Sequence, residues 1–332
     1  MVPGLIAGQY RPEELQIDVK RLAEKAGIQV VIGKVVGIDP HKRYVLLENQ
    51  APIAYHLAAF DIGSTVAGLD SPGVQEHALA TRPIGVFVER IGPIIEQARQ
   101  HRPDAPFQVV VVGGGAGGVE VAFTLQQRLQ TEASRAAVRV VLLESGPHIL
   151  TGYADSLRHR VYRTSEKRGL KILCNRRVAS VQSDRVQFEE GEAIPCQVVL
   201  WVTGAVSQPI FKGSGLPTDG RGFVQVRSTL QVEGHNDVFA AGDCSTLLDH
   251  PHTPKAGVHA VQQGPLITHN IRARMLGQPL RHYRPQSDFL VLLNLGDGSA
   301  LGTKWGRCVQ GRWVMGLKDS IDRRFMRRFQ LE

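Results

Sequence analysis

The sequence predicts an α/β fold built from parallel sheets, and three observations lead to this prediction. Residues 109–112 form a short, wholly apolar, β-branched run, which suits a strand buried on both faces of a parallel sheet. Residues 113–118 then follow the pattern G-x-G-x-x-G and precede apolar residues at helical spacing. A second apolar run, 138–143, ends at Glu144. This order of strand, glycine turn, helix, strand and acid is typical of a Rossmann-like dinucleotide-binding unit.

Each glycine of this turn has a mechanical reason to be glycine. Gly113 permits the tight turn, Gly115 lets the backbone approach a pyrophosphate, and Gly118 lets the helix pack close to the strand. The free N–H groups of the helix N-terminus favour phosphates. Glu144 can accept hydrogen bonds from a ribose 2′-hydroxyl and would repel a 2′-phosphate, so NAD(H) is favoured over NADP(H). The alternative is a glycine-rich turn in an ordinary α/β domain.

The overall composition is that of a soluble globular protein with room for two domains. The chain has 332 residues, of which 42% are hydrophobic and 21% charged. It contains no apolar run of the roughly 18 residues that span a bilayer, and no signal peptide. The four cysteines lie far apart without a C-x-x-C pair, which fits a reducing cytoplasm. The net charge of +8 permits an anionic partner, but no basic groove with interleaved aromatic residues indicates nucleic acid.

The sequence contains two copies of one plan. In each copy a helix ends at a glycine, short strands with turn signals follow, and an apolar strand ends in another glycine. The spans are 36 residues from Gly27 to Gly63 and 35 residues from Gly169 to Gly204. If both copies carry a glycine loop, the first would lie about 30 residues before Met1. We therefore expect the chain to begin inside its first nucleotide-binding domain; the alternative is that this copy never had such a loop.

Further elements are predicted along the chain. A helix is expected over 10–26, and an apolar strand before Gly242 and Asp243 suits another cofactor contact, because the carboxylate can accept a hydrogen bond from a sugar-alcohol hydroxyl. A helix is expected over about 258–276. The C-terminal segment is expected to hold strands at 289–293 and 312–317 and a basic terminal helix.

Four motifs, in this order, resemble the two-dinucleotide-binding flavoproteins. They are Val-Val-Val-Gly-Gly-Gly-Ala-Gly-Gly-Val-Glu, Leu-Leu-Glu-Ser-Gly, Trp-Val-Thr-Gly-Ala and Phe-Ala-Ala-Gly-Asp-Cys. Within this family the chain is similar to the type II NADH dehydrogenases. The likeness is strongest to the flavoprotein module fused to, or encoded with, selenide, water dikinase, through residues 61–64, 254–258 and 318–329.

The resemblance implies tandem Rossmann-like domains with parallel sheets and β-meander insertions, followed by a small C-terminal α+β domain. Residues 1–82 and 206–284 would form an FAD-binding domain, 83–205 an NAD(H)-binding domain, and 285–332 the C-terminal domain with its basic helix. The family's N-terminal FAD glycine loop is missing from this sequence. Its absence would weaken or abolish flavin binding, because the FAD pyrophosphate loses its helix N-terminus.

The same resemblance implies cofactor contacts. Gly113, Gly115 and Gly118 would carry the NAD pyrophosphate, and Glu144 the adenosine ribose. Gly242 and Asp243 would hold the ribityl-phosphate region of FAD, with Lys255 to Gly257 beside the isoalloxazine. The whole cofactor-binding set is Gly113, Gly114, Gly115, Gly118, Glu144, Gly204, Gly242, Asp243, Lys255, Ala256 and Gly257. No metal is expected.

No dedicated catalytic acid or base is required, because the reactivity of hydride transfer belongs to the cofactors. The two candidates are Glu120, which the resemblance directs towards the nicotinamide, and Lys255. Glu120 could instead be a helix acid favoured by the dipole, Lys255 a solvated lysine, and Asp243 a helix N-cap. Cys244 is expected to be a packed residue, and 249–252 a polar loop rather than a metal site.

The C-terminal stretch 318–332 predicts a basic amphipathic helix. Ile321, Phe325 and Phe329 recur at i, i+4 and i+8, while arginines cover the other faces. Such a helix can lie on an anionic membrane or dock its aromatic stripe on the protein's own core, and docking is favoured here.

Two functions follow as expectations. The first is an FAD-dependent oxidoreductase that passes hydride from NADH to flavin and electrons on to a quinone or other small acceptor. The alternative is a non-catalytic or regulatory partner of selenophosphate synthesis that lacks a complete FAD site. The expected partners are NADH, the acceptor, selenide, water dikinase and a second copy of the chain. The expected location is the cytoplasm, with peripheral contact at the inner membrane face.

Overall fold

The computed structural model describes residues 1–102, 104–132 and 137–330, and the chain forms two compact units. Unit 1 comprises Met1–Gln29, Val66–Gly204 and Leu290–Glu332, and unit 2 comprises Val30–Thr65 and Ala205–Phe289. Residues 1–29 and the C-terminal segment thus pack with the segment that carries the glycine turn. The division by cofactor expected from the sequence stays a prediction, because packing does not show which cofactor each unit binds.

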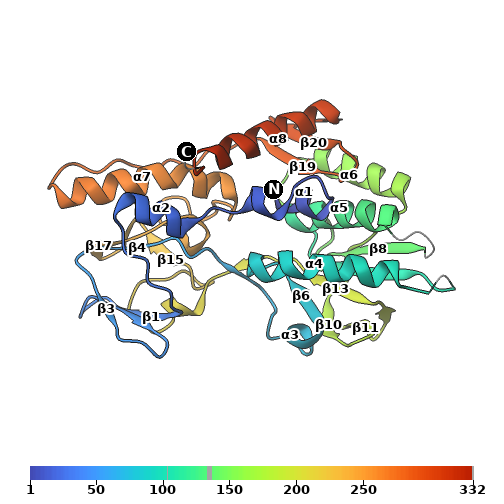
Figure 1. The fold of residues 1–332 in the computed structure, drawn as a ribbon, viewed down its shortest axis with the longest axis horizontal. Helices are drawn as coiled ribbons and strands as arrows, with labels where there is room; N and C mark the ends of the chain where they lie inside the picture. Colours follow the sequence, from blue (N-terminus) through green and yellow to red (C-terminus); the bar gives the residue numbers. More distant parts are fainter. Residues whose placement is uncertain (103, 133–136, 331–332) are drawn as a thin grey trace. The chain divides into compact units, whose positions relative to one another are not determined.

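Unit 1 is a five-stranded sheet with helices and two smaller sheets around it (Figure 1). Its helices are α1 (Val2–Ile6), η1 (Pro12–Leu15), α2 (Val19–Ala26), α3 (Val74–His77), α4 (Ile84–Arg99), α5 (Ala116–Glu132), α6 (Asp155–Arg168) and α8 (Arg312–Arg327). Its strands are β6 (Ala78–Ala80), β7 (Phe107–Val112), β8 (Val138–Leu143), β9 (Lys171–Leu173), β10 (Val178–Val181), β11 (Arg185–Phe188), β12 (Ala193–Pro195), β13 (Val198–Trp201), β19 (Val291–Asn294), β20 (Ala300–Lys304) and β21 (Arg307–Gly311).

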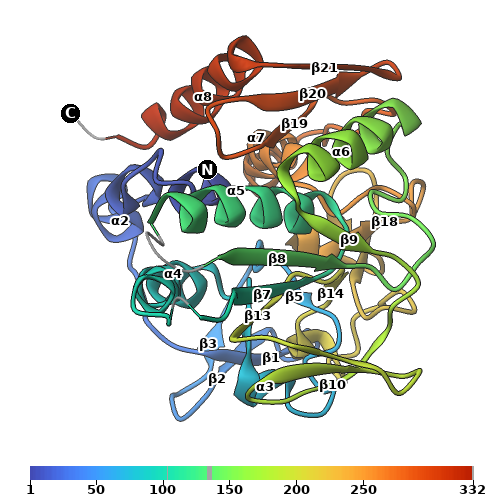
Figure 2. The same cartoon turned by 90° about the vertical axis from the view of Figure 1, so that its right-hand side faces the viewer.

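The central sheet of unit 1 has the order β6-β13-β7-β8-β9, and its strands are parallel. Strand β7 is buried on both faces, as its unbroken apolar run predicts. Val109 and Val111 enter the core shared with α4 and α5, whereas Val110 and Val112 enter a second core shared with β10 and β11. Figure 2 shows α5 along one face of this sheet and β10 towards the other.

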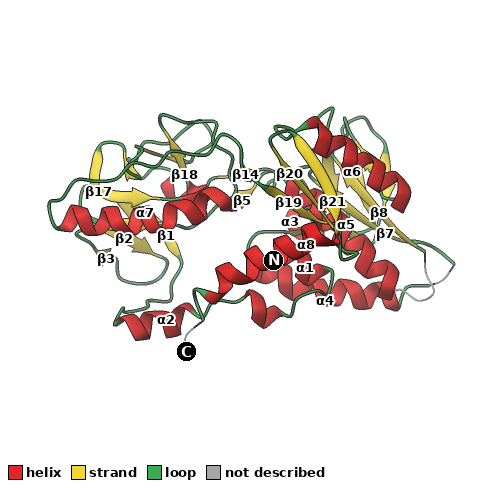
Figure 3. Cartoon of the chain, turned by 90° about the horizontal axis from the view of Figure 1, so that it is seen from above, coloured by secondary structure: helices red, strands yellow, loops and turns green. Residues whose placement is uncertain are grey.

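Unit 2 is organised around a second five-stranded sheet, of order β18-β15-β16-β17-β4, with the long helix α7 beside it (Figure 3). Its strands are β1 (Val35–Asp39), β2 (Tyr44–Leu47), β3 (Ile53–Ala54), β4 (Ala58–Phe60), β14 (Ala205–Val206), β15 (Val224–Val226), β16 (Gln231–Val232), β17 (His235–Ala240) and β18 (Ser245–Leu247). Its helices are η2 (Pro209–Phe211), η3 (Gly242–Cys244) and α7 (Gly257–Met275), and β5 (Thr65–Val66) lies where the chain leaves the unit.

The internal repeat is confirmed. Strands β1-β2-β3 in unit 2 and β10-β11-β12 in unit 1 each form a three-stranded antiparallel sheet. The strand after each meander joins the larger sheet in parallel: β4 pairs with β17, and β13 with β6 and β7. The α/β class with parallel sheets and β-meander insertions is therefore confirmed.

Two predicted elements are wrong. The helix expected over 10–26 is two helices, η1 and α2. Asp18 is the N-cap of α2, because its side chain accepts a hydrogen bond from the Arg21 N–H (2.9 Å). The strand expected over 312–317 is the first part of α8. Val314 and Met315 are buried there in a small core with Ala300 of β20, so packing against the sheet selects the helix.

Candidate cofactor sites

The turn after β7 requires glycine at two positions. Gly113 has φ +117°, and an added Cβ would lie 2.3 Å from the Val202 carbonyl oxygen. A Cβ at Gly118 would lie 1.8 Å from the Gly113 carbonyl oxygen, so only glycine lets α5 begin this close to the strand. The mechanical roles predicted for Gly113 and Gly118 are therefore confirmed.

Gly115 differs from these two glycines because it borders open space. No atom lies within 4 Å of a Cβ built on Gly115, and the same is true of Gly204. Gly115 directly precedes α5, whose N-terminal N–H groups form a favourable place for an anion. The arrangement fits a diphosphate approaching the backbone at Gly115, and this contact remains a prediction.

Glu144 ties the glycine turn to the end of β8. One carboxylate oxygen accepts the Gly114 N–H (2.9 Å), and the other accepts the Gly146 N–H (2.7 Å) and the Ser145 hydroxyl (3.2 Å). A carboxylate has about four acceptor sites, so these bonds leave room for a ribose hydroxyl. Glu144 thus has a structural function, fixing the turn, beside the predicted ribose contact.

Glu120 lies on α5 and contacts the C-terminal segment. Its Oε1 accepts the Asn294 backbone N–H at the end of β19 (2.8 Å). Burial raises the pKa of this carboxyl group, and the Lys318 ammonium and the Asn294 N–H act in the opposite direction. Glu120 is therefore more than a solvated helix acid favoured by the dipole. Its predicted orientation towards a nicotinamide is not tested.

The second predicted site lies in unit 2, at the turn after β17. Gly242 has φ +68°, and an added Cβ would lie 2.8 Å from Asp61 Oδ1. Its N–H donates to Gln263 Oε1 on α7 (2.6 Å), and the Ser64 hydroxyl donates to the Asp243 carboxylate (3.4 Å). Asp243 is not a helix N-cap, because η3 and α7 have Ala241 and Ala256 at those positions.

Lys255 is held against this turn. Its ammonium donates to the Ser245 carbonyl and to Thr246 Oγ1 (3.0 Å), and it lies 4.1 Å from the centre of the Phe223 ring. Burial lowers the pKa of Lys255 to about 8, and Arg221 lowers it further, while two aspartates oppose the shift. The alternative of a fully solvated surface lysine is therefore wrong; its contact with an isoalloxazine remains a prediction.

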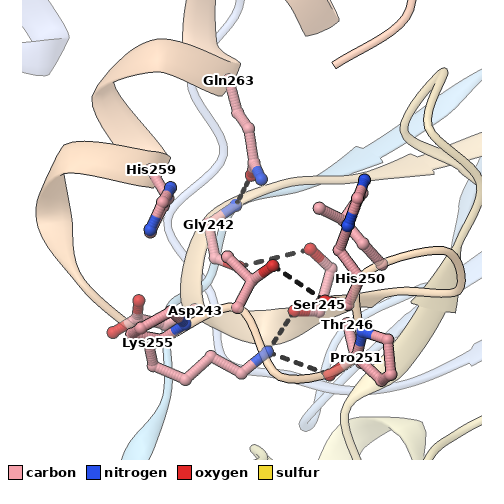
Figure 4. Close-up of a pocket in the computed structure, with 12 residues that line it drawn as sticks. Gly242, Asp243, Ser245, Thr246, His250, Pro251, Lys255, His259 and Gln263 are labelled. Atoms are coloured by element: carbon pink, nitrogen blue, oxygen red, sulfur yellow. Dashed lines mark hydrogen bonds between the residues drawn. The ribbon is translucent and has the colours of Figure 1, made fainter. Parts of the chain in front are cut away.

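Gly242, Asp243 and Lys255 border one small pocket of about 20 Å³ (Figure 4). It also includes His259 and Gln263 of α7, which the sequence did not assign to a site; their i, i+4 spacing on a predicted helix was the only available signal. Helix α7 begins beside the pocket at Gly257 with no side-chain cap and no acid in its first turn.

The residues present fit a polyhydroxylated, phosphate-bearing cofactor such as FAD. Within the described residues, His259 Nε2 is buried without a hydrogen-bond partner, and Gly257, where a built Cβ has no atom within 4 Å, admits close approach to the backbone. The uncapped helix N-terminus suits an anionic or electronegative group.

Two further candidates are Cys244 and the loop 249–252. Cys244 is fully buried, its thiol donates to the Ala241 carbonyl (3.1 Å), and burial raises its pKa to about 11, which confirms a packed residue. Residues 249–252 lie in a turn region after β18, and His250 and Pro251 line the same pocket as Gly242 and Asp243. In residues 1–102, 104–132 and 137–330, no three His, Cys, Asp or Glu side chains are grouped as metal ligands.

Helix α8 docks through other residues than expected. Val314 and Met315 are buried, whereas Ile321 is 46% exposed and Phe325 stacks edge-on with Phe329 at 5.1 Å. Of the expected Ile321–Phe325–Phe329 stripe, Ile321 therefore does not dock on the core, and Phe325 and Phe329 are half-buried. Residues 331–332 lie outside the described part. Across the part of the chain that the structure describes, no helix is long and apolar enough to cross a membrane.

The family match defines a class of oxidoreductase. The sequence matches the pyridine nucleotide-disulphide oxidoreductase family over residues 4–264, and the chain belongs to this family. It is a pyridine nucleotide-dependent oxidoreductase of a family whose cofactors are FAD and NAD(H), as the sequence predicted.

Its relatives include NADH dehydrogenases. The chain is 26% identical to demethylphylloquinone reductase NdbB of Synechocystis sp., over 90% of this chain and 74% of that protein. It is 25% identical to a type II NADH:quinone oxidoreductase of Staphylococcus epidermidis, over 96% of this chain and 82% of that protein. Among solved structures, the sulfide:quinone oxidoreductase of Aquifex aeolicus superposes with a TM-score of 0.82 at 17% identity, covering 98% of this chain and 81% of that one, which confirms the fold.

Proposed function

We propose that this protein is an FAD-dependent NADH oxidoreductase that delivers electrons to a quinone. The observation that carries the proposal is the family match over residues 4–264, which includes both the glycine turn at 113–118 and the Gly242–Asp243 pocket. Relatives named as quinone reductases align over 90% or more of the chain, and they support a quinone as the acceptor.

The protein's own residues position and desolvate the cofactors. A bound flavin supplies hydride acceptance and onward electron transfer. Open backbone at Gly115, with Glu144 fixed beside it, binds NADH. Asp243, Lys255 and the start of α7 bind the flavin. No residue of either site is required to move a proton, so binding and orientation are what this chain contributes.

The test uses the purified full chain reconstituted with FAD. We expect visible flavin absorbance that bleaches when NADH is added without oxygen and returns when a short-chain quinone is supplied. Gly115→Val, which places a branched side chain in the open space, should block bleaching by NADH but not by dithionite. Bleaching of the variant by NADH at the normal rate would contradict the NADH site. Bleaching without reoxidation by quinone would contradict the acceptor alone.

We further propose that the protein binds its quinone at a membrane surface. On α8, Trp313 is 64% exposed, Leu317 41% and Ile321 46%, at i, i+4 and i+8, so one helix face is apolar and solvated. Arginines on the same helix suit anionic lipid. Vesicles with anionic lipid should float the wild type, and replacing Trp313 and Leu317 by serine should abolish flotation, with Val309→Ser, on the neighbouring strand β21, as the control.

The selenophosphate alternative gains no support from these relatives. The expected homodimer and the dikinase partner likewise stay untested predictions.

A further inference from the structure

The pocket at Gly242 and Asp243 contains a histidine with one unsatisfied nitrogen. His259 is 4% exposed, and its Nε2 is buried with no hydrogen-bond partner among the described residues. A buried polar atom without a partner costs free energy, so such an atom in a pocket indicates a missing ligand. His259 and Asp243 both border this pocket (Figure 4).

The other ring nitrogen is fixed by a short hydrogen-bond chain. His259 Nδ1 lies 2.9 Å from the Tyr283 hydroxyl, which in turn donates to Gln262 Oε1 (3.1 Å). A tyrosine hydroxyl has one hydrogen, and it is used on Gln262. Tyr283 must therefore accept from His259, which places the ring proton on Nδ1 and leaves Nε2 as a lone-pair acceptor.

Neighbouring contacts hold this arrangement in place. The Tyr283 backbone N–H donates to the Ser228 carbonyl (2.7 Å), and Asn270 of α7 bonds both the N–H and the carbonyl of Arg281 (2.8 Å each). The Phe289 ring lies edge-on to the imidazole at 5.4 Å. Burial lowers the pKa of His259, which favours the neutral ring, although the Asp243 carboxylate acts in the opposite direction.

We propose that His259 is a flavin-positioning residue, whose Nε2 accepts a hydrogen bond from an O–H or N–H group of FAD bound at the Gly242–Asp243 pocket. Asp243 and His259 then present two acceptors to the cofactor from different elements, η3 and α7. This inference rests on the proposed function, in which this pocket binds flavin. It adds a specificity for hydrogen-bond donors that the family's glycine motifs do not provide.

The experiment compares two amide variants of the full chain. In His259→Asn the amide nitrogen can still donate to Tyr283, but the acceptor at Nε2 is lost. In His259→Gln an amide oxygen reaches the Nε2 position. We expect the FAD dissociation constant, measured by quenching of flavin fluorescence, to rise about tenfold in His259→Asn and to stay within about twofold of wild type in His259→Gln. His269→Asn, the same change elsewhere on α7, should have no effect.

A second measurement uses the wild type. In ¹⁵N-histidine NMR of the FAD-free wild type, His259 Nε2 should have the shift of an unprotonated ring nitrogen, and it should move upfield when FAD is added. If wild type binds FAD but the shift is unchanged and His259→Asn binds as tightly, the inference is wrong while the proposed function stands. The same unchanged shift and unchanged binding are expected if the only partner of His259 Nε2 is an ordered water, and the inference is then also wrong. If wild type binds no FAD at all, both are overturned.

Discussion

The glycine turn of unit 1 and the pocket of unit 2 are held in shape in different ways. In the turn, nearly every constraint acts between residues close in sequence or on adjacent strands: Gly118 against Gly113, and Glu144 against Gly114. In the pocket, Asp61, Gly242 and Gln263 meet from three separate segments. A site held by contacts between neighbouring backbone segments has a recognisable residue spacing in the sequence, whereas a site held by side chains from distant segments does not.

The largest expected effect is at Gly118. Gly118→Ala places a Cβ 1.8 Å from the Gly113 carbonyl oxygen, and backbone cannot yield as a side chain can. We expect a loss of about 3 kcal/mol in the free energy of unfolding, measured by urea denaturation. The matched control is Gly117→Ala, one residue earlier in α5, whose Cβ would meet only Val202 Cγ1 at 3.6 Å. It should be neutral or stabilising. Equal losses in both variants would refute the backbone-closure argument.

A smaller effect is expected at Gly242, where the obstacle is a side chain. Gly242→Ala combines a left-handed φ with a contact of 2.8 Å to Asp61 Oδ1. Gly234→Ala in the same unit has a similar φ of +75° and no atom within 4 Å, so it reports the conformational cost alone. We expect Gly242→Ala to cost about 2 kcal/mol and Gly234→Ala about 1 kcal/mol. A smaller loss at Gly242 would show that Asp61 moves aside freely.

Glu144, which fixes the turn and is predicted to contact the ribose, gives a further test. Glu144→Gln replaces one accepting oxygen by a donor that faces a backbone N–H, Gly114 or Gly146. We expect a loss of about 1 kcal/mol in stability and a fall of about fivefold in the ratio of kcat/KM for NADH over NADPH. Ser145→Ala removes only a hydroxyl donor to Glu144 and should leave the ratio unchanged. A changed ratio in the control would place the selectivity elsewhere.

The smallest effect concerns the desolvation of the pocket. The Lys255 pKa is lowered from 10.5 to about 8, so between these values the unfolded chain binds more protons than the folded one. Stability should therefore rise with pH across that window, and the rise should be smaller in Lys255→Met. After ¹³C reductive methylation, the NMR signal of Lys255 should titrate near pH 8. Titration near 10.5 would mean that the pocket is well hydrated.

The sequence alone determined the turn, the order of elements around it and the repeat. Val109 to Val112, Gly113 to Gly118 and Glu144 were recognisable because their constraints act over a single strand–turn–helix–strand unit, where spacing fixes geometry. The Arg312–Leu317 segment was misassigned because a short apolar run suits helix or strand equally, and only burial of Val314 and Met315 selects the helix.

The tertiary structure determined which residues lie next to one another. The fold places His259 and Gln263 beside Gly242 and Asp243. It also brings Glu120 into contact with Asn294, which is more than 170 residues away in the sequence. Hydrogen bonds and desolvation act over a few ångströms, and sequence spacing carries no information about such distances once the partners lie on different elements. The sequence thus determined the glycine turn and the contacts that hold it, and the fold decided which side chains surround the Gly242–Asp243 pocket.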